Sequence, residues 1–477
     1  MTEPTGNILY YGDNLDVLPR HIPDEFADLV YLDPPFNSNA TYNVLFGQAD
    51  GVKAAAQIKA FDDTWHWDQT AASSFQAVVT AGGDVASALV GLQTMLGPST
   101  MLAYLSMMAP RLVELRRVLK PTGSIYLHCD PTASHYLKLL MDAVFGAENF
   151  QNEVIWHYQT GGASKVRFSR KHDTIFFYSK SKKWQFHGDR IAVPRTEKAM
   201  ARAKNPKGAR IAADDDTKNP NDVILIQQMN PMARERLGYP TQKPEALLEA
   251  LILASSDPGD VVLDPFCGCG TTVAVAQRLK RRWVGIDITY LAISLIKSRL
   301  SAVGASDYTV LGEPTTADDA AQLAADDPYQ FQWWALGLIG ARPAEGKKGA
   351  DRGIDGRLYF FDEASDKPKQ MIVSVKAGKV QASYVRDLVG VLQREQAEMG
   401  VLISLNEPTQ PMRQEAASTG FYTSPWGQHP KVQLVTVAEL LEGKKLDMPA
   451  GGAHMMQVAM PPTPEPDVHP DQLSLGS

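Results

Sequence analysis

Cysteine is scarce in this sequence. Among 477 residues there are three cysteines, Cys129, Cys267 and Cys269. Three thiols cannot form the framework of disulfides that stabilises small secreted proteins. Cys267 and Cys269 lie one residue apart in a glycine-containing loop, and no further cysteine or matching histidine pair completes the ligand set of a structural zinc site. We interpret these two cysteines as small loop residues.

Long apolar runs are also missing. No stretch approaches the roughly 20 apolar residues that a membrane-spanning helix needs, and the first twenty residues lack the basic start and apolar core of a secretory signal. We therefore expect a cytoplasmic protein without a membrane partner. The composition, 44% hydrophobic and 21% charged, is that of a soluble globular protein. Because 477 residues are too many for one ordinary core, we expect two domains with connecting segments.

Positive charge is in short supply overall, but it is concentrated in one region. The formal net charge is −7, which argues against a uniformly basic protein that coats DNA. Residues 160–236 nevertheless contain 9 Lys and 8 Arg against 8 acidic residues, a local balance of +9 that leaves −16 for the remainder. Contacts with nucleic-acid phosphates require such a basic island. On charge alone, a solvated, lysine-rich insertion is an equally good interpretation.

Short apolar runs alternate with helical periodicity over the first 300 residues. Pro121-Thr122-Gly123 is expected to break the chain between one helix and the next strand, and residues 190–235 read as a loop-rich insertion. This alternation is typical of an α/β protein whose largely parallel sheet is covered on both faces. The predicted strands are 28–32, 124–128, 174–178, 261–263 and 283–288, and the predicted helices are 101–119, 132–145, 244–254, 272–279 and one that ends at 300.

The last third of the chain predicts a second, smaller αβ unit. An Ala/Asp-rich stretch at 304–327 is expected to be an interdomain linker. The smaller αβ unit follows at 328–446. Residues 447–477 contain a proline-rich segment and almost no periodic apolar pattern, so we expect them to be disordered.

A glycine loop lies between a predicted strand and a predicted helix. From Asp264 to Thr272 it reads Asp-Pro-Phe-Cys-Gly-Cys-Gly-Thr-Thr. Glycines permit a tight turn and let a ligand approach the backbone, and the helix N-terminus offers free N–H groups. Asp287 ends the next strand 23 positions after Asp264, about where a doubly wound fold places its ribose-binding carboxylate. Val273 stands where the dinucleotide fingerprint requires a third glycine, which disfavours a nicotinamide cofactor.

The tetrad Asp33-Pro34-Pro35-Phe36 follows the strand 28–32, at the end of the sheet where open α/β folds place their ligands. An exocyclic amine on a base ring is a poor nucleophile because its lone pair is delocalised. The Asp33 carboxylate and the rigidly held Pro34 carbonyl can accept both amine hydrogens and favour a nucleophilic nitrogen. Phe36 offers a flat face for a base that has left the duplex. Taken alone, the tetrad fits a simple strand followed by a proline turn equally well.

Together, the tetrad and the glycine loop resemble the DNA amino-methyltransferases that use S-adenosyl-L-methionine (AdoMet). The tetrad comes first, a basic segment follows and the glycine loop comes last, which is the circularly permuted order of the beta class. Two further segments, Gly12 to Leu15 and Pro240 to Glu245, are similar to the family's segments before the tetrad and before the AdoMet loop. The resemblance implies a Rossmann-like methyltransferase domain at 1–303, with a target recognition region at 159–236.

The resemblance also implies the roles of individual residues. In this family the glycine loop surrounds the methionine part of AdoMet, and the acid at the position of Asp287 takes the ribose hydroxyls. An Asp at the first tetrad position is more usual for adenine N6 and a Ser for cytosine N4, so we predict adenine N6 and keep cytosine N4 as the alternative. The implied catalytic residues are Asp33, Pro34, Pro35 and Phe36, and the implied cofactor-binding residues are Asp264, Phe266, Gly268, Gly270, Thr271, Thr272, Asp287, Lys243, Asp13 and Asn14, with no metal in this domain.

The second unit resembles the Mrr-type branch of restriction-endonuclease folds. In that branch an Asp and a Glu/Gln-x-Lys motif gather a divalent metal and water at a phosphate. This implies Asp355 as a Mg²⁺ ligand, Lys376 at the scissile phosphate and Asp351 as a further site residue. Ser374 stands where the pattern has Glu or Gln, so one ligand is weakened or lost. An active nuclease, a DNA-binding or inactive remnant and a coincidental αβ domain all remain open.

We therefore predict a site-specific enzyme that methylates adenine N6 of a flipped base in double-stranded DNA, within a restriction-modification system. An active second unit would make the chain a bifunctional methyltransferase-nuclease. RNA and protein-glutamine methylation also use proline-rich tetrads, but the basic insertion and the nuclease-like unit favour DNA. Double-stranded DNA is the expected partner, and a homodimer is left open.

Overall fold

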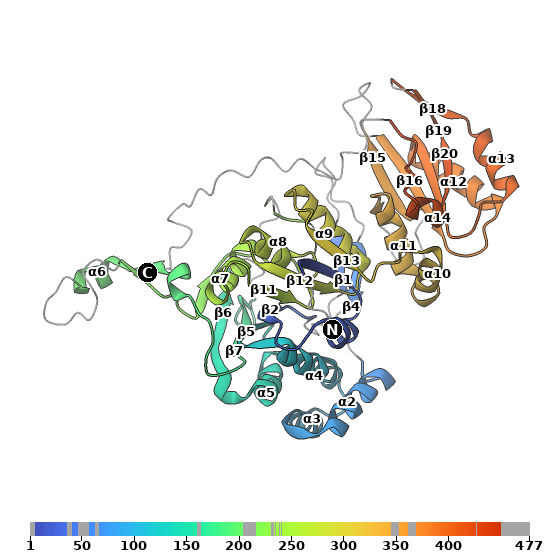
Figure 1. Ribbon diagram of the computed structural model, residues 1–477. Coiled ribbons are helices and arrows are strands. Elements are labelled where there is room, and N and C mark those ends of the chain that lie inside the picture. Colours follow the sequence, from blue (N-terminus) through green and yellow to red (C-terminus); the bar gives the residue numbers. More distant parts are fainter. Residues whose placement is uncertain are drawn as a thin grey trace.

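The computed structural model describes residues 5–35, 41–45, 57–62, 66–159, 164–203, 216–229, 233, 235–237, 239, 241–344, 353–360, 369–425 and 427–449. Figure 1 shows a large α/β body and a smaller unit that contains the last strands and helices of the chain. No helix in this described part combines the length and the apolar character that a bilayer crossing requires.

The large body is built on a nine-stranded sheet. The six neighbouring strands from β5 to β13 are joined by five parallel pairings. Strand β10 pairs parallel with β6, and β7 alone runs in the opposite direction. In spatial order the strands are β10 (Val223–Leu225), β6 (Phe150–His157), β7 (His172–Ser179), β5 (Leu119–Cys129), β2 (Ala27–Leu32), β11 (Val261–Asp264), β12 (Arg282–Asp287), β1 (Asn7–Tyr11) and β13 (Tyr308–Leu311). The predicted α/β class with a mostly parallel sheet is confirmed.

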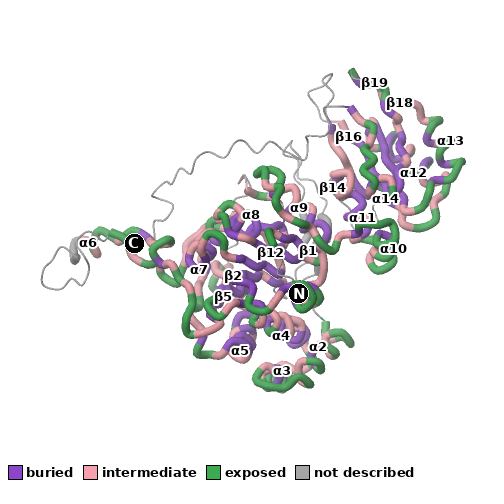
Figure 2. The backbone as a smooth tube through the Cα atoms, viewed as in Figure 1, coloured by how far each residue is buried: buried purple, intermediate pink, exposed green. Residues whose placement is uncertain are grey.

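Helices cover both faces of this sheet, and β2 shows why. Every residue of β2 is buried; Leu29 and Tyr31 point into one core, and Val30 and Leu32 point into the other, because successive side chains of a strand face opposite ways. Figure 2 shows buried strands inside the large body and helices that combine buried, intermediate and exposed residues around them. One face carries α1 (Asn14–His21), α2 (Gln69–Ala81), α3 (Gly83–Leu96), α4 (Thr100–Val118) and α5 (Ser134–Phe145); the other carries α7 (Glu245–Ser255), α8 (Thr271–Arg278) and α9 (Tyr290–Ala302).

The predicted break at Pro121-Thr122-Gly123 is wrong. Helix α4 ends at Val118, and β5 begins at Leu119 and runs through this tripeptide. A Cβ on Gly123 would lie 2.7 Å from Leu119 Cδ1 and 2.9 Å from the Asp28 carbonyl oxygen. The glycine therefore allows the strand to pass close to β2, instead of ending it.

The interval 304–327 differs from the expected linker. Its first part forms β13, which pairs with β1 and completes the main sheet, and its second part forms helix α10 (Ala317–Asp326). Thr316 and Asp319 make a capping box at the start of α10, and alanine favours helix strongly. The Ala/Asp composition thus reflects a capped helix.

The smaller unit contains a five-stranded sheet in the order β14 (Arg342–Pro343), β15 (Gly356–Phe360), β16 (Lys369–Lys376), β17 (Met399–Ser404) and β20 (Val432–Thr436). Helices α12 (Ala382–Glu395) and α13 (Gln410–Ser418) pack on one face. On the other face lie α11 (Pro328–Leu338) and α14 (Val437–Leu441). A hairpin of β18 (Phe421–Ser424) and β19 (Gly427–Pro430) completes this unit.

Helix α11 joins the two units. Phe331 and Trp334 are buried in one continuous apolar cluster that also contains Ile293 of α9 and Val373 of β16. The Gln330 side chain accepts a hydrogen bond from the Tyr290 backbone N–H, with an N···O distance of 2.9 Å.

The tail beyond 446 was expected to be disordered, and its first residues are ordered. Asp447 is held by His429, 2.7 Å from Nδ1 to Oδ1, and its backbone N–H donates to the Gln433 side chain. Residues 450–477 lie outside the described residues.

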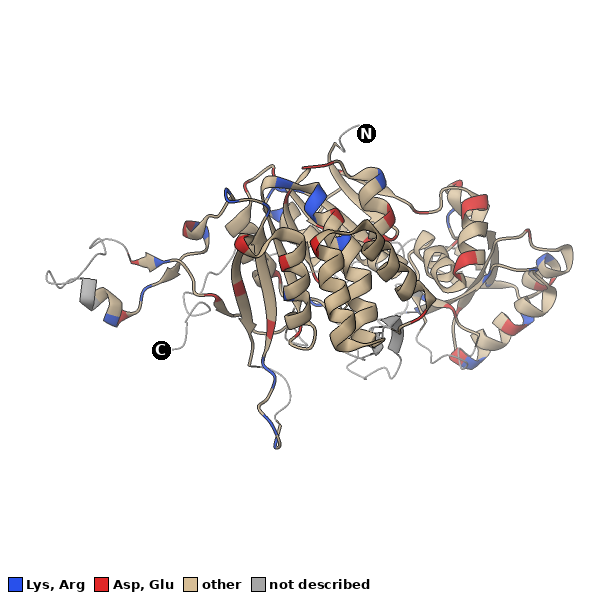
Figure 3. Cartoon of the chain, turned by 90° about the horizontal axis from the view of Figure 1, so that it is seen from below, with Lys and Arg blue, Asp and Glu red and all other residues tan. Residues whose placement is uncertain are grey.

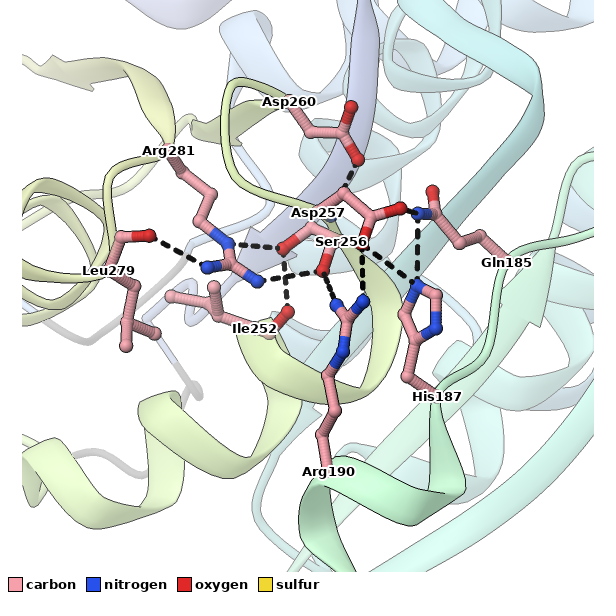
Figure 4. A network of polar contacts seen from close by, with 9 residues as sticks. All are labelled: Gln185, His187, Arg190, Ile252, Ser256, Asp257, Asp260, Leu279 and Arg281. Atoms are coloured by element: carbon pink, nitrogen blue, oxygen red, sulfur yellow. Dashed lines mark hydrogen bonds and ion pairs between the residues drawn. The ribbon is translucent and has the colours of Figure 1, made fainter.

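The predicted target recognition region, 159–236, is only partly an insertion. Strand β7 lies inside the main sheet, whereas η2 (Gly188–Ile191), β8 (Val193–Pro194), α6 (Glu197–Ala203) and β9 (Thr217–Lys218) lie outside it. Figure 4 shows how this outer part is anchored to the turn between α7 and β11. The Arg190 guanidinium donates hydrogen bonds to the Ser256 carbonyl oxygen and to the Asp257 carboxylate. The same carboxylate accepts a hydrogen bond from the Gln185 side-chain amide.

Candidate active site

Three aspartates end three neighbouring strands of the main sheet. Asp264 and Asp287 are the last residues of β11 and β12, and Asp33 follows β2 directly. These strands are parallel neighbours, so their carboxyl ends meet at one edge, where open α/β sheets bind ligands. The strand order therefore brings together acids that lie more than 200 positions apart in the sequence.

The Asp33 carboxylate forms an ion pair with Lys243. Lys243 Nζ donates to Asp33 Oδ2 from the segment that leads into α7. Lys243 is only 8% exposed, and a buried charge is costly unless an opposite charge accompanies it. The pair therefore holds both side chains in place. The sequence assigned Lys243 to the cofactor, whereas its ammonium group lies at the predicted catalytic carboxylate.

The second carboxylate oxygen, Asp33 Oδ1, is buried and accepts no hydrogen bond from the described residues. Buried polar atoms in proteins nearly always have a partner, so this oxygen is available to a donor on a ligand. Pro34 and Pro35 line the same cavity as Asp33. Phe36 lies outside the described residues, and its predicted stacking role stays a prediction.

The predicted glycine loop turns tightly from β11 into α8. Gly270 has a left-handed φ of +75°, and a Cβ there would lie 2.6 Å from Ile296 Cγ1. Gly268 donates its N–H to Asp287 Oδ2, with an N···O distance of 2.8 Å. Gly268, Thr271 and Thr272 line the cavity, whereas Gly270 shapes the turn behind it.

Asp264 is buried at the floor of this loop. Its Oδ1 accepts the Phe266 N–H at 3.0 Å. Burial raises the pKa of Asp264 to about 7, because hydrogen bonds from Thr272 and Phe266 offset only part of the desolvation, and the charges of Asp33 and Asp287 add to the rise. A positively charged ligand beside Asp264 would oppose this rise, because an opposite charge favours the ionised carboxylate.

Asp287 is fixed by several donors at the cavity wall. Its Oδ1 accepts the backbone N–H and the hydroxyl of Thr289, at 2.8 and 2.7 Å. Its backbone carbonyl accepts the Gly12 N–H at 2.9 Å. Desolvation raises the pKa of Asp287, and the hydrogen bonds from Thr289 and Gly268 oppose this rise. The carboxylate is thus held in a single orientation at the cavity wall.

Asp13 and Asn14 reach the cavity from the N-terminal segment. The Asn14 amide donates to the Pro265 carbonyl at 2.7 Å, which joins this segment to the glycine loop. Arg111 of α4 donates to both Asp13 carboxylate oxygens, at 2.7 and 2.9 Å, and to Asn14 Oδ1. The sequence did not reveal Arg111, because one arginine in a long helix normally faces solvent.

All these groups surround one cavity of about 600 Å³, a volume typical of a small-molecule site. It contains Asp33, Pro34, Pro35 and every predicted cofactor residue except Gly270; the members are Asp13, Asn14, Lys243, Asp264, Phe266, Gly268, Thr271, Thr272 and Asp287. The acidic edge, the open glycine loop and the fixed Asp287 carboxylate fit a cofactor with a cationic centre and a ribose.

A buried chain of hydrogen bonds leads away from this cavity. Tyr31, which lines it, shares a hydrogen bond with His128 Nδ1 at 3.0 Å. His128 Nε2 contacts Asp173 Oδ2 at 3.2 Å, and Tyr158 donates to Asp173 Oδ1 at 3.2 Å. Burial is the largest single influence and opposes ionisation of Asp173, but the interactions with His128, Lys243 and Tyr158 together outweigh it and lower the pKa of Asp173. These residues come from four strand ends, so no local sequence pattern could have indicated the chain.

The predicted nuclease residues show a different arrangement. Asp355 Oδ2 accepts Ser374 Oγ at 3.1 Å, the Val375 N–H at 2.7 Å and Lys376 Nζ at 3.4 Å. No group of three His, Cys, Asp or Glu side chains within the described ranges could hold a metal ion, and Asp351 lies outside those ranges. The described donor set therefore does not fit Mg²⁺.

Comparison with known protein families matches both units. A family described as DNA methylase matches residues 27–298, and a family described as NACHT-associated inactive restriction endonuclease 1 matches residues 329–442. The two resemblances seen in the sequence, to DNA amino-methyltransferases and to restriction-endonuclease folds, are thereby confirmed.

Individual relatives agree with the first match. The Type II methyltransferase M.HpaI of Haemophilus parainfluenzae is 38% identical over 201 residues, which are 42% of this chain and 60% of that protein. The chain thus spans less than two thirds of M.HpaI. The DNA adenine methyltransferase YhdJ of Escherichia coli is 30% identical over 319 residues, 64% of this chain and 88% of that protein. A solved structure, the PvuII DNA methyltransferase (cytosine-N4-specific), aligns over 62% of this chain and 87% of its own at 16% identity, with a TM-score of 0.39.

The DNA methylase match covers more than half of the chain, and YhdJ is matched over most of its length. The chain therefore belongs to the DNA methylase family.

Proposed function

We propose that this protein transfers a methyl group from AdoMet to the N6 amine of an adenine flipped out of double-stranded DNA. The observation that carries the proposal is the Asp33 carboxylate. Its Oδ2 is paired with Lys243 and its buried Oδ1 accepts nothing from the described residues, within the same cavity as the glycine loop.

The residues of the tetrad prepare the amine for attack. Asp33 Oδ1 accepts one amine hydrogen and the Pro34 carbonyl accepts the other, which withdraws the nitrogen lone pair from the ring. Two acceptors held by rigid prolines and by a buried ion pair need no rearrangement when the amine arrives. When the nitrogen gains the methyl group it must lose a proton, and Asp33 is the carboxylate placed to receive it.

The cofactor supplies an activated methyl group on a sulfonium. Asp264, Gly268 and Thr271 would hold its methionine part, and the fixed Asp287 carboxylate would accept its ribose hydroxyls. Arg111 holds Asp13 and Asn14 beside the glycine loop, where they would complete the cofactor pocket.

Adenine is the proposed base for two reasons. An aspartate begins the tetrad, and YhdJ, matched over 88% of its length, is named a DNA adenine methyltransferase. M.HpaI is named a Type II methyltransferase, which supports a place in a restriction-modification system. Cytosine N4 is the alternative that the same geometry would serve.

For the smaller unit we propose an accessory role without DNA cleavage. Ser374 replaces the usual carboxylate or amide ligand. The Ser374 hydroxyl and the Lys376 ammonium group both donate hydrogen bonds to Asp355 Oδ2. The matching family carries the description inactive.

The proposal is tested by methylating unmethylated genomic DNA with the purified chain and isotope-labelled AdoMet, followed by nucleoside analysis. We expect labelled N6-methyladenine. Asp33→Ala should remove the label without changing AdoMet affinity, and Asp16→Ala, at an exposed position of α1, is the matched control. Label in N4-methylcytosine would replace adenine by cytosine, and full activity of Asp33→Ala would reject the site.

A further inference from the structure

The loop between β6 and β7 forms a basic hairpin tip. From Ser164 to Lys171 it reads Ser-Lys-Val-Arg-Phe-Ser-Arg-Lys, with four cationic and no acidic residues. In Figure 3 a hairpin banded with Lys and Arg stands away from the body of the protein. Two apolar side chains share this tip. Val166 is 92% exposed and Phe168 is 98% exposed.

The tip is held in shape by its own serines. Ser164 N–H donates to Ser169 Oγ at 3.0 Å, and Ser164 Oγ accepts the N–H groups of Val166 and Arg167, both at 3.3 Å. These bonds close a compact turn and leave the Phe168 ring in solvent. An aromatic ring exposed to this extent is costly in a free protein, and its four cationic neighbours indicate a polyanion as the partner.

The hairpin projects from the catalytic edge of the sheet. Strands β6, β5 and β2 run in one direction, so the carboxyl end of β6 lies at the edge where Asp33 lies. Tyr158 and Lys171 pair at its base, and Tyr158 begins the buried chain through Asp173 and His128 to Tyr31. The base of the hairpin is thus tied to the wall of the active-site cavity.

We propose that this tip is a wedge for duplex DNA, with Phe168 stacking on bases at the position from which the target base leaves, and with Lys165, Arg167 and Arg170 on the flanking phosphates. This inference rests on the proposed function. An aromatic face stacks on any base, and an apolar wedge separates base steps where a duplex is opened. Phe168 would take the place of the extruded base between its neighbours in the duplex, while Asp33 binds the extruded base in the cavity.

The test measures binding of unmethylated mixed-sequence duplex DNA over a series of salt concentrations, together with methyl transfer. We expect Phe168→Ala to weaken binding about tenfold without changing the slope of log K against log salt. Arg167→Ala should reduce that slope by about one. Phe168→Tyr should bind like the wild type, whereas Phe168→Leu, which lacks a stacking face, should be as weak as Phe168→Ala. The matched control is Phe421→Ala in β18, where the ring is 62% exposed.

Several results would overturn the wedge. Wild-type affinity of Phe168→Ala would do so, and so would full rescue by Phe168→Leu, since that would show that DNA binding needs no stacking ring at this position. If Phe421→Ala lost as much DNA affinity as Phe168→Ala, a specific role of Phe168 would also be rejected. If the wild type methylates DNA while Phe168→Ala is unaffected, only the wedge fails; if the wild type neither binds nor methylates DNA, the proposed function fails.

Discussion

Lys243 and Asp33, which are 210 positions apart in the sequence, form a buried ion pair at the edge of the main sheet. The pair links the segment before the glycine loop to the tetrad, and it leaves the buried Asp33 Oδ1 without a hydrogen-bond partner among the described residues. Lys243 is therefore a positioning residue for the proposed base contact.

Removing Lys243 should impair turnover more than cofactor binding. Lys243→Met leaves Asp33 without its counter-ion, and a small displacement of a reacting group can cost about 100-fold in rate. We expect kcat to fall by about that factor and the Kd for AdoMet to change less than threefold, with partial rescue of kcat by Lys243→Arg. The measurement combines methyl-transfer kinetics with calorimetric titration of AdoMet. The opposite pattern, a raised Kd with unchanged kcat, would restore the sequence-based assignment of Lys243 to the cofactor.

Asp264 should make stability depend on pH. Its native pKa is raised from 3.8 to about 7 by burial, so between these values the native state binds a proton that the unfolded chain has lost. This contribution is fully present below about pH 4 and is lost as the pH rises through 7, an upper limit on the order of 4 kcal/mol.

Asp264→Asn isolates that contribution. The amide has the same shape and does not titrate, so the wild type should lose stability relative to the variant as the pH rises from 4.5 to 7.5. Urea unfolding midpoints of both proteins over this range provide the measurement. Parallel curves would show that Asp264 titrates at an ordinary pH.

How much of this site the sequence predicts depends on whether the pattern is local. The tetrad after β2 and the loop after β11 are continuous strings, and the loop and the described part of the tetrad, Asp33 to Pro35, line one cavity as expected. The partners of the site residues could not be predicted in this way, because they come from segments distant in the sequence. Lys243 contacts Asp33, Arg111 contacts Asp13, and His128 contacts Tyr31. Their contacts follow from strand order and register, which no single segment carries.

The same distinction explains the differences in the fold. Gly123 was interpreted as part of a break because proline and glycine end most helices and strands, but its neighbour Asp28 belongs to another strand. Strand β13 is short, and only its pairing with β1 makes it part of the sheet. Helix α10 carried a readable signal, the capping box of Thr316 and Asp319, which its Ala/Asp composition obscured.

Gly270→Ala should destabilise the cofactor loop. The left-handed φ of +75° is strained for alanine, and the new Cβ would meet Ile296 at 2.6 Å. We expect a loss of about 1–3 kcal/mol in unfolding free energy and weaker AdoMet binding. Gly91→Ala is the matched control, because Gly91 lies in α3 with nothing within 4 Å of a Cβ, where alanine should stabilise by about 0.5–1 kcal/mol. Equal effects of the two substitutions would contradict this account of the loop.

The smaller unit should neither cleave DNA nor respond to Mg²⁺ until a carboxylate is restored. Ser374 is 4% exposed and contacts Asp355 Oδ2, so Ser374→Glu places two acids side by side in a buried site. Like charges at that distance disfavour each other strongly, and we expect the unit to lose about 2–3 kcal/mol of stability in chelator. Mg²⁺ should return part of that loss, because a divalent cation neutralises the pair. Ser374→Met fills a similar space with neither charge nor a ligand oxygen and should be insensitive to Mg²⁺. Two measurements test this prediction: thermal unfolding with and without Mg²⁺, and a cleavage assay on supercoiled plasmid. If the wild-type chain cleaved the plasmid and Lys376→Ala did not, Asp355 would bind metal despite Ser374, and the unit would be a nuclease.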